Sequence, residues 1–167
     1  MRKMTEENLK NAYAGESQAH IKYLAFADAA EKEKFSNVAR LFRANSFAEQ
    51  VHATNHLRTL NGIGKTVANL QEALDGENFE VEEMYPAYKV VAENQGEKMA
   101  VTMFNAATEA EKVHAGLYKK AKATVDQSKD LGYFPVYVCS MCGFTVEAEA
   151  PDKCPICGAP KEKFIKF

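Results

Sequence analysis

The motif Glu-x-x-His occurs twice in this sequence, at Glu49–His52 and at Glu111–His114, each time within a stretch of helical periodicity. Residues three apart project from the same face of a helix, so each motif presents a carboxylate and an imidazole together. One copy arises often by chance in a charged helical protein. Two copies on alternate helices indicate one shared site, and they predict a helical bundle built around it.

Most of the chain before residue 126 is predicted to be helical. Between Met4 and Asn61 there is no proline and a single glycine, and apolar residues recur at helical spacing. The expected helices are a first ending near 32–35, a second to about Leu60, a short piece at 67–74, a third at 77–95 kinked by Pro86, and a fourth at 97–125. Four long helices with one long central connection favour a ferritin-like bundle over a simple up-and-down bundle.

The composition changes after Lys129. A β-like stretch at 133–138 leads into sequence rich in Pro, Gly and Cys. We therefore predict a bundle domain over residues 1–130 and a small second domain over residues 131–167. A domain of about 35 residues cannot usually bury a sufficient core without a staple such as a metal.

All four cysteines lie in this tail, as two C-x2-C pairs, Cys139–Cys142 and Cys154–Cys157, with eleven residues between the pairs. Gly143 and Gly158 follow the pairs, where a backbone knuckle can require positive φ. Such a set predicts a tetrahedral all-thiolate site for zinc or a single iron. The spacing does not decide between the two metals, and the tail alone would favour structural zinc.

Composition and charge exclude several classes of protein. The formal net charge is −2 and 46% of the residues are hydrophobic, which is unlike a disordered acidic segment or a basic nucleic-acid binder. No stretch approaches the ~20 apolar residues of a membrane span, and the N-terminal residues show no signal-peptide core. We expect a soluble cytoplasmic protein, in which clustered cysteines serve metal or redox chemistry.

The other two helices of the bundle are expected to supply inward-facing glutamates. Glu16 lies among small and apolar residues, and Glu77 and Glu80, three apart, can face one site. Glu16 precedes Glu49 by 33 positions and Glu77 precedes Glu111 by 34. This repeat predicts two related helical hairpins, each contributing one Glu and one Glu-x-x-His.

Taken singly, a helical glutamate usually faces solvent and a lone histidine is usually structural. His20 and His56 each lie four residues from a proposed ligand, but the repeat leaves them no counterpart. We interpret both as structural or supporting residues. The four-helix pattern as a whole favours a di-metal site.

On these motifs, the sequence resembles the rubrerythrin family over nearly the whole chain. The matching stretches are 14–19, Glu49–His52, 76–86, 109–114 and the four-cysteine tail. The tail is also similar to rubredoxin in Tyr137 and in its Cys-Pro-x-Cys-Gly, although the loop between its cysteine pairs is much shorter. The resemblance implies a mainly α fold, a ferritin-like four-helix bundle with a C-terminal rubredoxin-like domain.

The resemblance also implies the metals and their ligands. The di-iron ligands would be Glu16, Glu49, His52, Glu77, Glu80, Glu111 and His114. A further iron would be held by Cys139, Cys142, Cys154 and Cys157. Glu49 and Glu111 would bridge the two irons. One iron would exchange His52 for Glu80 on oxidation, because iron(III) is harder and prefers an anionic oxygen.

The implied activity is reduction of hydrogen peroxide to water in oxidative-stress defence. Electrons would come from NAD(P)H through a separate reductase or rubredoxin, since the chain has no G-x-G-x-x-G fingerprint. They would pass from the four-cysteine iron to the di-iron site, where Tyr23 and Tyr85 could help deliver protons. Family members are dimers or larger, so we expect a homodimer or larger homo-oligomer, and the donor domain could serve a partner chain.

Two other functions fit parts of the sequence. A ferroxidase or iron-handling protein would use the same bundle with oxygen, but it needs no attached electron donor. A non-enzymatic binding module would hold zinc in the tail and use the bundle as a scaffold.

Overall fold

The computed structural model describes residues 1–167. They form two compact units, residues 1–64 and residues 65–167. The mainly α fold class is confirmed, because long helices make up the first unit and most of the second. The predicted boundary at residue 130 separates the helices from the cysteine-rich tail, and it stays a prediction. No helix is long and apolar enough to cross a membrane.

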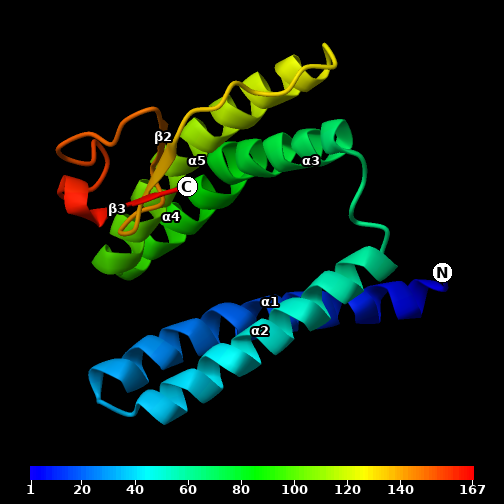
Figure 1. Cartoon of the computed structure of the whole chain (residues 1–167), viewed down its shortest axis with the longest axis vertical. Helices are drawn as coiled ribbons and strands as arrows, with labels where there is room; N and C mark the ends of the chain where they lie inside the picture. The colour runs from blue at the N-terminus through cyan, green and yellow to red at the C-terminus, as the bar shows by residue number, and fades with distance from the viewer. The chain divides into compact units, whose positions relative to one another are not determined.

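The first unit is an antiparallel hairpin of α1 (Lys3–Lys32) and α2 (Ser36–Thr59), which lie side by side (Figure 1). Its buried apolar residues are all alanines: Ala27, Ala30, Ala39 and Ala53. Small side chains at the contact let the two helix axes approach closely. Both helices were predicted from the sequence, and their ends agree with the structure to within a few residues.

A buried polar contact also joins α1 to α2. The Ser46 hydroxyl donates to the carbonyl oxygen of His20 over 2.9 Å, and His20 Nδ1 lies 2.9 Å from the Ser46 carbonyl oxygen. Ser46 is 1% exposed, so these bonds satisfy polar groups that water cannot reach. His20 therefore has the structural role that the sequence predicted.

The second unit begins with one continuous helical run. It consists of α3 (Thr66–Phe79), a π-helical turn (Glu80–Met84) and α4 (Tyr85–Gln95). The predicted separation of a short piece at 67–74 from a helix at 77–95 is wrong. Gly76 lies inside α3, because a helical glycine costs only about 1 kcal/mol and does not end a helix. Pro86 follows the π-helical turn, whose wider winding accommodates the missing N–H.

The long helix α5 (Lys98–Val125) returns antiparallel to this run (Figure 1). Gly96, in left-handed conformation with φ 72°, ends α4 before it. The tail then folds into a three-stranded antiparallel sheet of order β2-β1-β3, beside a short 3-10 turn (Lys161–Lys163). The strands are β1 (Val136–Cys139), β2 (Thr145–Glu147) and β3 (Phe164–Lys166).

Candidate metal centres

The first unit brings Glu16 of α1 together with Glu49 and His52 of α2. Their ligand atoms all lie within 4.8 Å of one another. His52 Nδ1 is 3.0 Å from Glu49 Oε2 and 3.9 Å from Glu16 Oε1. Two carboxylates and an imidazole on Nδ1 form a donor set that suits iron.

The second unit repeats this cluster with Glu77 of α3 and with Glu111 and His114 of α5. His114 Nδ1 is hydrogen-bonded to Glu111 and lies 3.9 Å from Glu77 Oε1, the same separation as between His52 and Glu16. The composition and geometry of the two clusters agree with the two-hairpin repeat. The side chain of His114 is 23% exposed against 54% for His52, so the second cluster is the more enclosed.

Electrostatics in the second cluster favour a bound cation. Burial raises the pKa of Glu77 to about 7, helped by its hydrogen bond to Glu111 and by repulsion from that carboxylate. Burial, followed by repulsion from Glu111, also raises the pKa of Glu80. Crowded carboxylates disfavour the charged form unless a positive charge joins them. Glu80 therefore lies close to this cluster, and its proposed exchange with His52 stays a prediction.

His114 connects this cluster to the four-cysteine domain of the same chain. Its Nε2 lies 2.9 Å from the Thr145 hydroxyl and 3.1 Å from the carbonyl oxygen of Gly143. The Thr145 hydroxyl itself donates to the Gly143 carbonyl, so its oxygen accepts from His114. Nε2 therefore faces two acceptors and carries a proton. With a metal bound, Nδ1 would offer its lone pair to the metal in place of its present contact with Glu111.

The two predicted tyrosines occupy different surroundings. Tyr85 packs against Phe104, with ring centroids 5.9 Å apart. Burial raises the pKa of Tyr85, and the charges of Glu80 and Glu111 raise it further, so the phenol lies near the second cluster. Tyr23 packs against Phe26 and Phe42 within the first unit.

The four cysteines converge as their spacing predicted. The Sγ atoms of Cys139 and Cys157 lie 3.7 Å apart, and those of Cys142 and Cys154 lie 3.5 Å apart. Metal–sulfur bonds of ~2.3 Å give a tetrahedron with edges of about 3.8 Å, so the thiols fit one ion. Gly143 and Gly158 adopt the predicted positive φ, 82° and 73°.

A backbone hydrogen bond closes each knuckle. The N–H groups of Gly143 and Gly158 donate to the carbonyl oxygens of Cys139 and Cys154, each over 2.9 Å. Burial raises the pKa of Cys142 far above its ordinary value, although the N–H of Phe144 favours its thiolate. Four neighbouring thiolates repel one another unless a cation lies between them. A bound metal would supply that positive charge.

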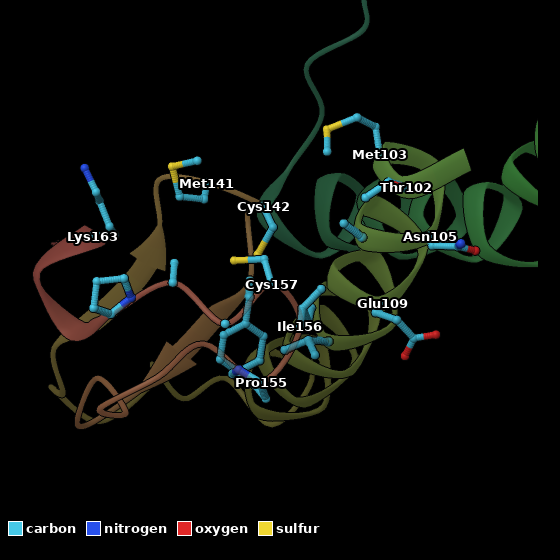
Figure 2. A pocket seen from close by; sticks show the side chains of 16 residues that line it. Thr102, Met103, Asn105, Glu109, Met141, Cys142, Pro155, Ile156, Cys157 and Lys163 are labelled. Atoms are coloured by element: carbon cyan, nitrogen blue, oxygen red, sulfur yellow. The ribbon is translucent and has the colours of Figure 1, made fainter. Parts of the chain in front are cut away.

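A pocket of about 990 Å³ lies between α5 and the cysteine loops. Figure 2 shows Thr102, Met103 and Glu109 of α5 on one side of it, with Cys142 and Cys157 on the other. Two of the four thiols therefore line an open, largely apolar pocket.

The sequence predicted every residue of the three clusters, and the structure brings them together in three sets. Whether they bind metal as assigned stays a proposal. The sequence did not indicate Thr145 or Gly143 as partners of His114. That contact spans 31 residues between a helix and a strand, and no local pattern signals it.

Comparisons with known proteins identify the family of this chain. The rubrerythrin family model matches residues 7–122, and that of the rubrerythrin rubredoxin-like domain matches residues 137–165. Rubrerythrin-2 of Clostridium acetobutylicum is 40% identical, over 98% of this chain and 97% of the relative. Nigerythrin of Nitratidesulfovibrio vulgaris is 38% identical, over 98% of this chain and 86% of the nigerythrin chain.

The solved structures give the same result. The fully reduced, all-ferrous state of nigerythrin matches with a TM-score of 0.56 and 36% identity, over 98% of this chain and 86% of that one. Iron is therefore the metal of a related protein, and the carboxylate, imidazole and thiolate donors here suit it. The chain belongs to the rubrerythrin family of ferritin-like, di-iron oxidative-stress proteins.

Proposed function

We propose that this protein is an oxidoreductase, a non-haem di-iron peroxidase that reduces hydrogen peroxide to water. One peroxide takes up two electrons and two protons and yields two waters. The observation that carries the proposal is the position of His114. Its Nδ1 faces two carboxylates while its Nε2 is bonded to the knuckle that follows Cys142. One side chain thus connects the residues of an electron-transfer centre to those of a catalytic centre.

The two carboxylate-histidine clusters would together hold two irons, with Glu80 as the additional ligand. When bound there, two iron(II) ions would supply the two electrons that one peroxide requires. The chain's own contribution is to hold anionic oxygens and neutral imidazoles in place. In the second cluster, Thr145 and Gly143 keep the proton on Nε2 of His114.

Protons for the two waters would come from side chains near the clusters. The raised pKa of Tyr85 keeps its phenol neutral at physiological pH, so its hydroxyl remains able to donate. Tyr23 would have the corresponding role at the first cluster, as the family resemblance implies.

Electrons would enter at the four-cysteine domain. Cys157 is exposed and Cys142 is partly exposed, and both line the pocket beside α5. A separate NAD(P)H-linked reductase or a rubredoxin would deliver electrons there one at a time. Because the four-cysteine domain contacts His114 of its own chain, donation within one chain reaches the second cluster directly.

The test is a comparison of oxidants. Fully reduced protein is mixed with hydrogen peroxide or with oxygen under otherwise equal conditions, and the appearance of the ferric absorption is followed. We expect the faster reaction with peroxide. A faster reaction with oxygen would instead support a ferroxidase or iron-handling function. A protein with zinc in the tail, no iron and no visible colour would overturn both.

A matched pair of variants links the activity to the site. Glu111→Gln removes a proposed bridging carboxylate and should lower peroxide reduction at least about tenfold. Glu93→Gln changes an exposed carboxylate on α4 that pairs with Lys89, and its rate should equal that of the wild type.

A further inference from the structure

The strand β2 of the four-cysteine domain packs along α5. It is an outer strand of the sheet, in the order β2-β1-β3. Side chains two apart in a strand point to the same side, so Thr145 and Glu147 both face the helix. The strand therefore presents one hydroxyl and one carboxylate to α5, and each of them has a partner there.

The first contact lies at the N-terminal end of β2. The Thr145 hydroxyl is 2.9 Å from Nε2 of His114. The backbone also comes close to the helix here, because a Cβ added to Gly143 would lie 4.0 Å from the Cβ of Ala110. Ala110 is only 1% exposed. Small residues on both sides thus allow the close approach that brings Thr145 within reach of His114.

The second contact lies at the other end of β2 and depends on Lys120 of α5. The Lys120 ammonium donates to Glu147 Oε2 over 2.5 Å. The same ammonium lies 5.0 Å from the centroid of the Phe134 ring, two residues before β1 begins. A cation over an aromatic face is attracted to it. One lysine therefore binds two separate segments of the four-cysteine domain.

No carboxylate on α5 itself is placed to pair with Lys120. The positions three and four residues away are 116, 117, 123 and 124, which hold Gly, Leu, Ala and Thr. Two other lysines of this helix differ, since Lys112 pairs with Glu109 and Lys122 pairs with Asp126. The contact of Lys120 thus joins the helix to the four-cysteine domain and is not a pair within the helix.

The two contacts together fix the direction of β2 on the helix. Lys120 lies six residues beyond His114, which is about 9 Å along α5. Glu147 lies two residues beyond Thr145, which is about 6.6 Å along β2. A domain held at one point can pivot about it, whereas a second contact further along the helix prevents the pivot.

We propose that Lys120 is a positioning residue for electron transfer from the four-cysteine site to the second cluster. By binding Glu147 and Phe134, it keeps the four-cysteine domain packed on α5 and the two sites at a constant distance. The inference rests on the proposed function. In that function the four-cysteine iron passes from iron(II) to iron(III), and one ferric bundle iron takes up the electron and becomes ferrous. Such a transfer slows steeply as the two sites move apart.

Reversing the charges tests the contact. Lys120→Glu places two carboxylates together and removes the cation over Phe134, so the ratio of packed to detached four-cysteine domain should fall about tenfold. Lys120→Glu combined with Glu147→Lys restores an ion pair with its charges exchanged, and it should recover most of the loss. The control is Lys122→Glu, which makes the same charge change on α5 at a lysine that pairs with Asp126.

The first readout is backbone NMR relaxation of the full chain loaded with zinc, which carries out no redox chemistry. A packed four-cysteine domain tumbles with α5, whereas a detached one reorients faster. We expect faster reorientation of residues 136–166 in Lys120→Glu, and in the wild type at high salt because salt screens the exposed ion pair. The doubly changed chain and the control should behave like the wild type at low salt.

Hydrogen exchange separates positioning from folding. Amides of β1, β2 and β3 should stay protected in every variant, because their partners lie within the sheet. If Lys120→Glu unfolds the sheet, Lys120→Met removes the charge without repulsion and takes its place. Reorientation as slow as in the wild type overturns the proposal, and so does a charge-exchanged chain that recovers nothing.

The second readout is the transfer itself, followed by rapid mixing of the fully reduced iron protein with an oxidant. Lys120→Glu should leave oxidation of the bundle site unchanged and slow the later oxidation of the four-cysteine iron up to about tenfold. Equal rates for that later step overturn the positioning role. If the bundle reacts faster with oxygen than with peroxide, the proposed function fails. The later step is then measured with oxygen, so the role of Lys120 is decided separately.

Discussion

At the residue scale, both ring nitrogens of His114 have partners, and these partners lie on different elements. As a proposed ligand it would offer Nδ1 to a metal, while both neighbours of its Nε2 belong to the four-cysteine domain. A histidine ligand is held in one tautomer by the hydrogen bond on its other nitrogen. Thr145 supplies the shorter of the two contacts, so it acts as a positioning residue.

Replacing Thr145 tests this role. Thr145→Val keeps the shape of the side chain but removes the acceptor for Nε2–H, leaving the Gly143 carbonyl alone. We expect iron affinity at the bundle site to fall about tenfold, measured by competition with a chelator. Thr145→Ser retains the hydroxyl and should bind iron like the wild type. Equal affinities for the Val and Ser variants would contradict the role.

At the element scale, the helical run from Thr66 to Gln95 contains a π-helical turn beside the second cluster. The π-helical turn Glu80–Met84 lies between Glu77 and Pro86. It accommodates the proline and keeps Glu77 and Glu80 near the same carboxylate, Glu111. Single π-helical turns inside α-helices are frequent at functional sites.

The end of this run depends on one glycine. Gly96 has φ 72°, a conformation that a side chain disfavours, so Gly96→Ala should lower the free energy of unfolding by about 1 kcal/mol. Gly116 lies inside α5 with nothing within 4 Å of an added Cβ, and Gly116→Ala should raise stability by up to about 1 kcal/mol. Urea titrations followed by circular dichroism measure the free energy of unfolding of both variants. If both substitutions changed it in the same direction, the conformational explanation for Gly96 would be contradicted.

At the scale of the whole molecule, the tail depends on its metal more than the helices do. In the tail only Cys139, Ala150 and Cys154 are buried. Two of these three are metal ligands by proposal, so the apolar core is almost absent. A small domain of this kind folds largely through the energy of metal binding.

Metal removal should therefore unfold the tail selectively. After chelation under reducing conditions, amide protons of residues 136–166 are expected to exchange rapidly, while those of α1 and α2 stay protected. Hydrogen exchange followed by mass spectrometry resolves the two regions. Rebinding of iron or zinc should restore protection in the tail. Persistent protection of the strands without metal would contradict this dependence.

The sequence by itself determined the helices, the three ligand clusters and the cysteine knuckles, because these depend on spacing within one element or one repeat. Glu49 and His52 face the same way on any α-helix, and Gly143 follows Cys142 in any such knuckle. The continuity of α3 through Gly76 was missed, because helix propensity is weak beside packing against α5.

Only the tertiary structure decided which residues of separate elements bond to one another. The bonds from His114 to Thr145 and from Ser46 to His20 link positions 31 and 26 residues apart, so no local period encodes them. The physical reason is that spacing along the chain fixes the direction of a side chain on its own element, whereas its partner is chosen by how separate elements pack.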